Sequence, residues 1–435
     1  MKLSIAQYGL IAAAFVACAL GAASASAQTL AIAPNPAMAD EAFSVRASGL
    51  EPGERVTIQA DLTDGADQRW NSEAEFIADA QGNVDTSTQA PASGSYKEVS
   101  GPGLVWSMRP ADKHVALYRD PERFTVQAID FQLERKDQPP LTATLQQMRV
   151  PEGIRRIRLQ GELHGWAFVP RSTDRIPAVL VVGGSEGGVP VEKAVWLASH
   201  GYAALALAYF RYENLPPDLE AIPLEYFGNA ISWLMQQPEI DPARIAVMGT
   251  SRGGELALQL GSMYPEIRAV VAYVPANVRY PACCGGTSVP YAWTWHGQPL
   301  AYAMPRDIRN GGGEMLNAEI AVEQTKGPIL MIGAEDDGVW ESSRMVDEAA
   351  GRLKHAHFAY PVVVLKYPHA GHRAGLPEII PAWHGEVTHP VSGAKMNFGG
   401  TVAGDAQSSL DAIPKVLDFL RTSLQPAASA PASSK

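Results

Sequence analysis

The sequence predicts an α/β domain with a doubly wound parallel sheet, preceded by a smaller, all-β, immunoglobulin-like sandwich domain. Two observations support this prediction. Strands of period two, separated by short turns, come first, and buried apolar strands then alternate with helices over the rest of the chain. The 435 residues are enough for two such domains, and 46% hydrophobic with 19% charged residues is a globular composition.

Residues 1–27 have the pattern of a secretory signal peptide. Lys2 supplies the positive charge, a short apolar run follows, and Ala25 to Ala27 form a small-residue cleavage site. We therefore expect an exported protein, periplasmic or extracellular, with no membrane span after cleavage; an uncleaved anchor is the alternative. Loss of one Lys leaves 34 basic and 46 acidic residues, a net charge of −12. This acidity disfavours nucleic acid or an anionic membrane as the partner.

The mature chain would keep two cysteines, Cys283 and Cys284, because Cys18 leaves with the signal peptide. Two adjacent cysteines form neither a disulfide framework nor a metal-type spacing, so no metal is expected. In an oxidising compartment they could form a disulfide between neighbours or remain two thiols, and the sequence leaves both open.

Residues 28–145 are predicted to form the sandwich. Phe43, Val45 and Ala47 alternate with polar residues, as expected of a strand with one buried face. Further short strands are expected at 54–62, 74–78 and 123–133. The polar, proline-containing stretch 136–140 is interpreted as a boundary segment.

Residues 146–424 are predicted to form the α/β domain, and 425–435 a disordered tail. After an initial two-strand segment, buried strands are expected at 177–184, 203–210, 244–249, 267–275, 327–337 and 358–372. Helices are expected at 191–202, 224–237 and 253–264. This alternation indicates a parallel, doubly wound sheet.

A Gly-Thr-Ser-Arg-Gly segment surrounds Ser251, directly between a buried strand and a helix. This is the context of a nucleophile elbow, in which a sharp turn exposes the serine at the edge of the sheet. Gly249 and Gly253 suit such a turn, because a Cβ at either position would meet the neighbouring backbone. Ser251 is therefore the candidate nucleophile.

A serine hydroxyl needs a base, and in this fold an acid and a histidine follow the nucleophile in that order. Asp336 and Asp337 end the strand at 327–337, and the residues leave the choice between them open. The unused acid is expected to cap the next helix. His372, deep in the loop after the next strand, is the predicted base, with His369 as the alternative.

An oxyanion hole needs backbone N–H groups aimed at the developing negative charge. We expect one from Arg252, directly after the nucleophile, and one from the Gly-rich segment 183–188, with Ser185 the first choice and Gly184 the second. That segment lacks the ending of a phosphate-binding loop. Four features in the expected order at the carboxyl ends of strands indicate an α/β-hydrolase.

Three blocks carry a closer resemblance: 47–110, 206–234 and 245–258. They resemble the family of acyl-CoA thioesterases and bile-acid-CoA:amino-acid N-acyltransferases, with similarity over most of residues 30–425. The resemblance implies a β-sandwich followed by an α/β-hydrolase domain.

The resemblance also implies roles for individual residues. It favours Asp337 as the acid, because Trp340 and Ser342 complete a D-x-x-W-x-S-like stretch. The Tyr-Pro-x-x-Gly-His pattern of the family ends here at His372. Family members that conjugate amino acids include ones with Cys as the nucleophile, so Ser251 implies hydrolysis.

We therefore expect an exported serine hydrolase that cleaves a small-molecule acyl thioester or ester through a Ser251–Asp337–His372 triad, without a cofactor. Export leaves open whether coenzyme A is the leaving group. The insertion at 280–302 contributes Trp293, Trp295 and Tyr302 as candidates for an acyl pocket. The alternatives are an acyltransferase or peptidase on the same scaffold, or a catalytically silent binding protein.

Overall fold

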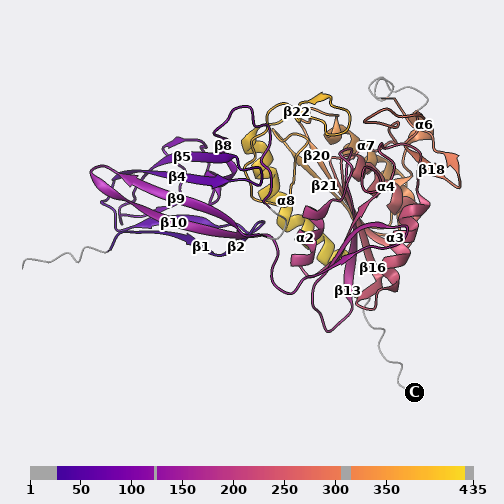
Figure 1. Cartoon of the computed structure of the whole chain (residues 1–435), viewed down its shortest axis with the longest axis horizontal. Helices are drawn as coiled ribbons and strands as arrows, with labels where there is room; N and C mark the ends of the chain where they lie inside the picture. Colours follow the sequence, from indigo (N-terminus) through magenta and orange to yellow (C-terminus); the bar gives the residue numbers. More distant parts are fainter. Residues whose placement is uncertain (1–26, 122–124, 305–314, 427–435) are drawn as a thin grey trace, which may run out of the picture.

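The computed structural model describes residues 27–121, 125–304 and 315–426 (Figure 1). The predicted signal peptide, except Ala27, lies outside the described residues, as does most of the predicted tail. Figure 1 shows a β-sandwich on the left and a larger α/β body on the right, with the C-terminal helix α8 between them. The predicted fold class, an α/β-hydrolase sheet preceded by an all-β domain, is confirmed.

The sandwich has two sheets, one of three strands in the order β1-β3-β6 and one of seven strands. In the larger sheet the order is β2-β10-β9-β4-β5-β7, and β8 also pairs with β5. The bounds are β1 Thr29–Ala33, β2 Ala37–Met38, β3 Ser44–Ser48, β4 Arg55–Thr63, β5 Arg69–Ile77, β6 Val84–Asp85, β7 Ser93–Gly94, β8 Arg109–Pro110, β9 Gln127–Arg135 and β10 Gln138–Met148.

Apolar and polar residues alternate along the strands, so each sheet has one apolar face that packs inside the sandwich. Val45, Ile58 and Trp70 are each fully buried in one cluster between the sheets. The prediction of a boundary at 136–140 is wrong. Residues 136–137 are the turn of an antiparallel hairpin, and residues 138–140 already belong to β10. The register shifts between Gln138 and Leu141, where two prolines cannot donate to the ladder.

The α/β body is built on an eight-stranded sheet with the order β11-β12-β14-β13-β16-β17-β20-β21. All strands from β14 onward in this order are parallel, whereas β11 and β12 are antiparallel to their neighbours. The bounds are β11 Arg155–Arg158, β12 His164–Val169, β13 Ile176–Val182, β14 Ala203–Ala208, β16 Ile240–Thr250, β17 Ile267–Tyr273, β20 Ile329–Ala334 and β21 Val362–Tyr367.

Helices cover both faces of this sheet, so its central strands are continuously apolar. Side chains of α3, α4 and α7 pack in one cluster, and those of α2 and α8 pack in the other. The bounds of these helices are α2 Val191–Ser199, α3 Glu225–Gln236, α4 Arg252–Met263, α7 Ser342–His355 and α8 Val402–Ser423. The shorter elements are α1 Gly103–Trp106, α6 Met315–Ala318, η1 Val322–Gln324, β15 Ile222–Pro223, β18 Trp293–Trp295, β19 Gln298–Pro299, β22 Val387–Thr388 and β23 Lys395–Met396.

The sandwich supports one segment of the α/β body, residues 376–398, which includes β22 and β23. Backbone hydrogen bonds join Ile379 N to Ala39 O at 2.7 Å and Ala382 N to Trp106 O at 3.0 Å. Arg149, 6% exposed, adds a buried ion pair to Glu378 at 2.6 Å. The sandwich therefore fixes the position of this segment, whose other side faces the candidate site described below.

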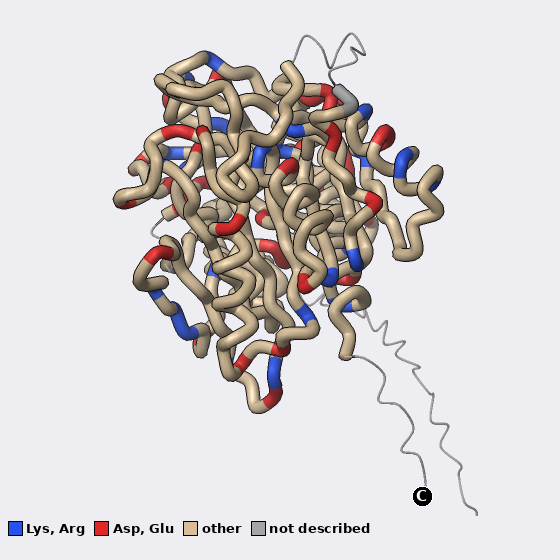
Figure 2. The backbone as a smooth tube through the Cα atoms, turned by 90° about the vertical axis from the view of Figure 1, so that its right-hand side faces the viewer, with Lys and Arg blue, Asp and Glu red and all other residues tan. Residues whose placement is uncertain are grey.

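Acidic and basic residues are interspersed over the face turned to the viewer in Figure 2. Within the described residues, the helices all fall short of the length and hydropathy needed to cross a membrane.

Candidate active site

Ser251 lies at the turn between β16 and α4, with φ 58° and ψ −121°. Such a conformation is strained for a residue with a side chain and persists where the surroundings enforce it. Both flanking glycines are required by close backbone contacts: a Cβ at Gly249 would collide with Gly253 O, and one at Gly253 would collide with Gly183 O. The turn therefore holds the Ser251 hydroxyl beyond the carboxyl end of the sheet.

The structure brings together Ser251, His372 and Asp337. His372 Nε2 lies 2.8 Å from Ser251 Oγ, and His372 Nδ1 lies 3.0 and 2.9 Å from the two carboxylate oxygens of Asp337. Because a carboxylate only accepts hydrogen bonds, Nδ1 carries the ring proton and Nε2 is free to accept the proton of Ser251. This is the geometry of a nucleophile, base and acid.

Asp337 is held by three donors besides His372. Ser342 Oγ donates to Oδ2 at 2.6 Å, and the backbone N–H groups of Val339 and Trp340 donate to Oδ1 at 2.9 and 3.2 Å. The Asp337 side chain is 1% exposed, so these bonds replace its solvation. The Ser342 hydroxyl and the turn at Val339 and Trp340 thus hold the Asp337 carboxylate toward His372.

Asp336 points elsewhere. Its carboxylate is 52% exposed and lies 3.4 Å from Nδ1 of His369, itself 77% exposed. The prediction that the second acid caps the following helix is wrong, because α7 begins at Ser342 and is preceded by Glu341, which makes no side-chain cap. The residues between Asp336 and α7 form a turn around Asp337 instead.

The His372 ring lies between two aromatic side chains. Trp340 meets it edge-on at 5.4 Å between centroids, and Phe398 stacks with it at 6.1 Å. The His372 backbone N–H also donates to Phe398 O at 2.7 Å. Trp340 is fixed in turn by a 3.0 Å hydrogen bond from its Nε1 to Val274 O. These contacts restrict the imidazole to the orientation that serves both Ser251 and Asp337.

The predicted oxyanion donors lie beside Ser251. Arg252 is the first residue of α4, where an amide has no acceptor inside the helix. Residues 183–188 approach the nucleophile so closely that a Cβ on Gly184 would be 3.4 Å from Ser251 Cβ. The Gly184 N–H itself donates to Glu186 Oε1 at 3.0 Å, which favours Ser185 over Gly184 as the second donor.

A cavity of about 490 Å³ opens over Ser251, within the usual size range of small-molecule sites. Apolar side chains contribute much of its wall, among them Trp340, Leu376, Val387, Met396 and Phe398. Four of these five belong to the segment 376–398 that the sandwich supports. The sandwich thus shapes the cavity indirectly, through the segment that it fixes.

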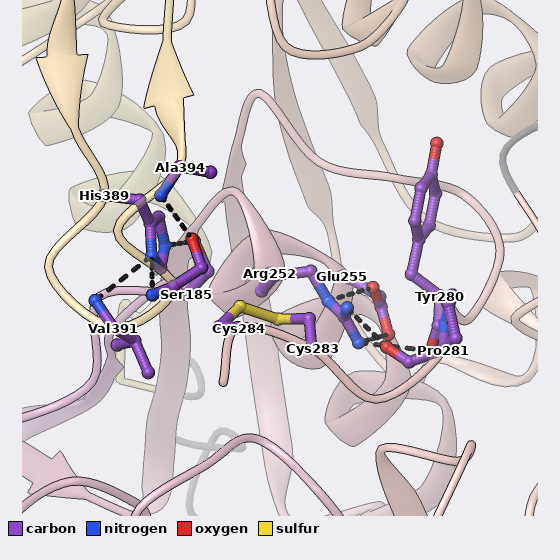
Figure 3. Close-up of a disulfide and its surroundings, with 11 residues drawn as sticks. Ser185, Arg252, Glu255, Tyr280, Pro281, Cys283, Cys284, His389, Val391 and Ala394 are labelled. Atoms are coloured by element: carbon purple, nitrogen blue, oxygen red, sulfur yellow. Dashed lines mark hydrogen bonds and ion pairs between the residues drawn. A yellow bond between two sulfur atoms is a disulfide. The ribbon is translucent and has the colours of Figure 1, made fainter. Parts of the chain in front are cut away.

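Cys283 and Cys284 also line this cavity and form a disulfide (Figure 3). Of the two states that the sequence leaves open, the structure has the bonded one. Their segment is anchored behind the nucleophile, because the Arg252 guanidinium donates to Tyr280 O at 3.1 Å and to Pro281 O at 2.8 Å.

The prediction of an acyl pocket formed by Trp293, Trp295 and Tyr302 is not supported, because none of them is among the residues that line this cavity. Trp293 is 1% exposed and donates its indole N–H to buried Glu255 at 2.7 Å. Trp295 packs edge-on against Tyr264. A buried tryptophan needs a partner for its N–H, and Glu255 supplies it on the core side of α4.

A buried ion pair lies directly behind the nucleophile. Arg252 and Glu255 have side chains 5% and 0% exposed, with Nε 2.9 Å from Oε2. Burial raises the pKa of the Glu255 carboxyl, and the charge of Arg252 opposes that shift. The charge of Arg252 thus offsets part of the cost of burying the Glu255 carboxyl.

Replacing Glu255 by leucine is expected to lower the free energy of unfolding by about 3–5 kcal/mol, because it leaves the Arg252 charge buried without its partner. Denaturant unfolding of the variant measures the change. Arg421→Ala is the control, since it removes an ion pair whose partners are 64% and 63% exposed and should cost less than about 1 kcal/mol. Equal costs for the two variants would contradict this account of the Arg252–Glu255 pair.

The strand order and the turn that carries the candidate nucleophile define an α/β-hydrolase. Comparison with known proteins then identifies the family. The model of the acyl-CoA thioester hydrolase/BAAT N-terminal region matches residues 40–161, and that of the BAAT/acyl-CoA thioester hydrolase C terminus matches residues 222–290 and 293–426. The chain belongs to this family of thioester hydrolases and acyltransferases, which confirms the resemblance found in the sequence.

Individual relatives agree with this assignment. Acyl-coenzyme A thioesterase 1 of Homo sapiens is 29% identical over 402 residues, which cover 88% of this chain and 94% of that protein. The bile acid-CoA:amino acid N-acyltransferase of Homo sapiens is 30% identical over 421 residues, 90% and 97% of the two chains. Among solved structures, the α/β hydrolase MGS-M1 from a deep-sea metagenome library is similar with a TM-score of 0.39 and 16% identity, over 63% of this chain and 99% of its own.

His389 is a residue of the cavity that sequence reasoning missed. It lies after β22, 7% exposed, and its Nε2 is 3.0 Å from Ser185 Oγ. No motif surrounds it, and it is 204 residues from Ser185 in sequence. The signal that could have directed attention to it is a histidine within the irregular stretch that follows the predicted base.

Proposed function

We propose that this chain is an exported serine hydrolase that cleaves an acyl thioester or ester through an acyl-enzyme on Ser251. The observation that carries the proposal is the 2.8 Å contact between Ser251 Oγ and His372 Nε2, with Asp337 on the other ring nitrogen. Family membership supports the thioester class. The proposal of export depends on the pattern of residues 1–27.

The first half of the reaction forms the acyl-enzyme. Ser251 Oγ attacks the carbonyl carbon, its proton passes to His372 Nε2, and the π electrons of the carbonyl move onto its oxygen. The amides of Arg252 and Ser185 stabilise that oxyanion. When the tetrahedral intermediate collapses, the carbon–leaving group bond breaks, and His372 returns the proton to the departing thiolate or alkoxide.

The second half releases the acid. Water attacks the acyl-enzyme, gives a proton to His372, and the bond to Ser251 Oγ breaks as that proton returns to the serine. Asp337 stays ionised throughout and stabilises the imidazolium. The apolar wall formed by Trp340, Leu376 and Phe398 suits the acyl chain of the substrate.

A hydrolysis panel on the mature protein tests the substrate class. Acyl-CoAs of several chain lengths, acyl thioesters of a small thiol, and nitrophenyl esters with the same acyl groups should be compared by kcat/KM. We expect turnover of the thioesters and oxygen esters that share a preferred acyl group. Turnover of none of these substrates would contradict the proposal, and appearance of an amide when glycine or taurine is added would favour acyl transfer instead.

A further inference from the structure

A second histidine–serine pair lies in the wall of the cavity over Ser251. His389 comes from the segment after β22 and Ser185 from the Gly-rich segment after β13, and both side chains line the cavity. Figure 3 shows the His389 ring directed at Ser185, with Val391 on its other side. Neither side chain contacts His372 or Asp337 in the hydrogen-bond network described above, so the pair is separate from the triad.

The contacts of His389 determine which ring nitrogen carries the proton. The backbone N–H groups of Val391 and Ser392 donate to Nδ1 at 3.2 and 3.1 Å, so Nδ1 must be the acceptor. The single proton of the neutral ring is then on Nε2, which donates to Ser185 Oγ at 3.0 Å. A second proton on Nδ1 would face two donors, so the arrangement disfavours the charged ring.

The net effect of the surroundings of His389 is a lowered pKa, which also disfavours the charged ring. Burial lowers the pKa of His389, the carboxylate of Glu186 opposes this shift, and the guanidinium of Arg211 adds to it. Arg211 also joins the two segments, because it donates to Glu186 O at 3.1 Å and to Pro390 O at 2.9 Å. The histidine is thus a neutral, fixed donor.

A serine hydroxyl that accepts from a fixed donor has its own proton free for another acceptor. Ser185 Oγ accepts from His389, and the cavity beside Ser251 is the space that this hydroxyl lines. The Ser185 amide is also the favoured second oxyanion donor, since the neighbouring Gly184 amide is bound to Glu186. One residue can therefore present both an N–H and an O–H toward the same region.

We propose that His389 is a positioning residue that directs the Ser185 hydroxyl as an additional hydrogen-bond donor to the carbonyl oxygen of the substrate, next to the backbone amides. The proposal rests on the hydrolase function above and deepens it. The hydroxyl contributes a hydrogen bond only: no proton leaves Ser185 or His389, and the proton of Ser251 still passes to His372. Because the bond strengthens as the oxygen becomes negative, its effect falls on kcat more than on KM.

A double-mutant cycle tests the proposal with the mature protein and the best ester of the panel. Ser185→Ala keeps the amide and removes the hydroxyl, and it should lower kcat on the order of 10²-fold with little change in KM. His389→Leu should lower kcat about 10-fold, because the hydroxyl is then free to turn away. In the double variant the loss should equal that of Ser185→Ala alone, since His389 acts through Ser185.

His389→Gln is the conservative variant and should recover much of the rate, because its amide N–H can reach the place of Nε2. A purely structural role of His389 would instead give losses that multiply in the double variant, and that result would overturn the proposal. A Ser185→Ala variant with wild-type kcat would also overturn the proposal. This test of the Ser185 hydroxyl is available even if His389→Leu does not fold. If Ser251→Ala is inactive in the same assay while Ser185→Ala is fully active, the positioning role alone fails and the hydrolase function stands.

Discussion

Replacement of Ser251 by alanine is expected to lower kcat by at least about 10⁴-fold, because the acyl-enzyme can no longer form. The fold should be unaffected, since the removed hydroxyl contacts only His372 Nε2 among the described residues. The small residual rate should come from the oxyanion donors and substrate binding, which do not depend on the hydroxyl. Single-turnover hydrolysis of the best ester measures the loss.

Two further measurements make the Ser251→Ala result specific. A fluorophosphonate probe should label the unsubstituted protein at Ser251 and fail to label the variant. Ser262→Ala is the matched control, because it removes a serine hydroxyl near the other end of the same helix. There Oγ donates to Gln259 O and accepts a longer bond from Gln259 Nε2. Wild-type turnover by Ser251→Ala would contradict the hydrolase function, and labelling of another residue would assign the nucleophile elsewhere.

The fold, the nucleophile, the histidine and the pair of adjacent acids could be predicted because their signals are local, whereas the family resemblance was needed to favour Asp337 over Asp336. A continuous apolar strand, two glycines and a helix identify the turn at Ser251 without reference to the rest of the chain. Parallel strands end at one edge of a sheet, so Asp337 and His372, each after its own strand, were expected near Ser251. The strand order β16-β17-β20-β21 brings these three loops together at that edge.

The wall of the cavity could not be predicted, because its position depends on contacts between distant segments. Residues 376–398 have no regular periodicity, and the sandwich holds them through bonds such as Ile379 N to Ala39 O, across 340 residues of sequence. His389 and Phe398 enter the site with that segment. Trp293 was predicted to line the pocket and does not. An aromatic residue in an insertion has the same sequence pattern whether it lines a pocket or packs behind a helix.

The choice between two adjacent acids depends on side-chain direction, which spacing alone does not give. Asp337 is the residue whose carboxylate turns inward to Ser342 and His372, whereas Asp336 lies at the surface. This difference permits a closely matched pair of variants, in which the same chemical change is made at two neighbouring positions.

Asp337→Asn is expected to lower kcat on the order of 10⁴-fold, because it forces the wrong tautomer on His372. The backbone N–H groups of Val339 and Trp340 donate to the Oδ1 position, so the amide oxygen of the new asparagine should take that place. Its NH₂ group then occupies the Oδ2 position, 2.9 Å from His372 Nδ1, and donates to it. Nε2 must in consequence carry the ring proton, and it can no longer accept the proton of Ser251.

Asp336→Asn should leave kcat close to that of the unsubstituted protein, because the Asp336 carboxylate contacts only the exposed His369 among the described residues. The pair should be compared by kcat, KM and thermal denaturation. A merely structural role of Asp337 would lower the melting temperature and leave kcat of the folded fraction unchanged. The reverse ranking of the two variants, with the larger loss at Asp336, would show that the acid of the reaction is the residue that lies 3.4 Å from His369, and the proposed triad would have to be redrawn around it.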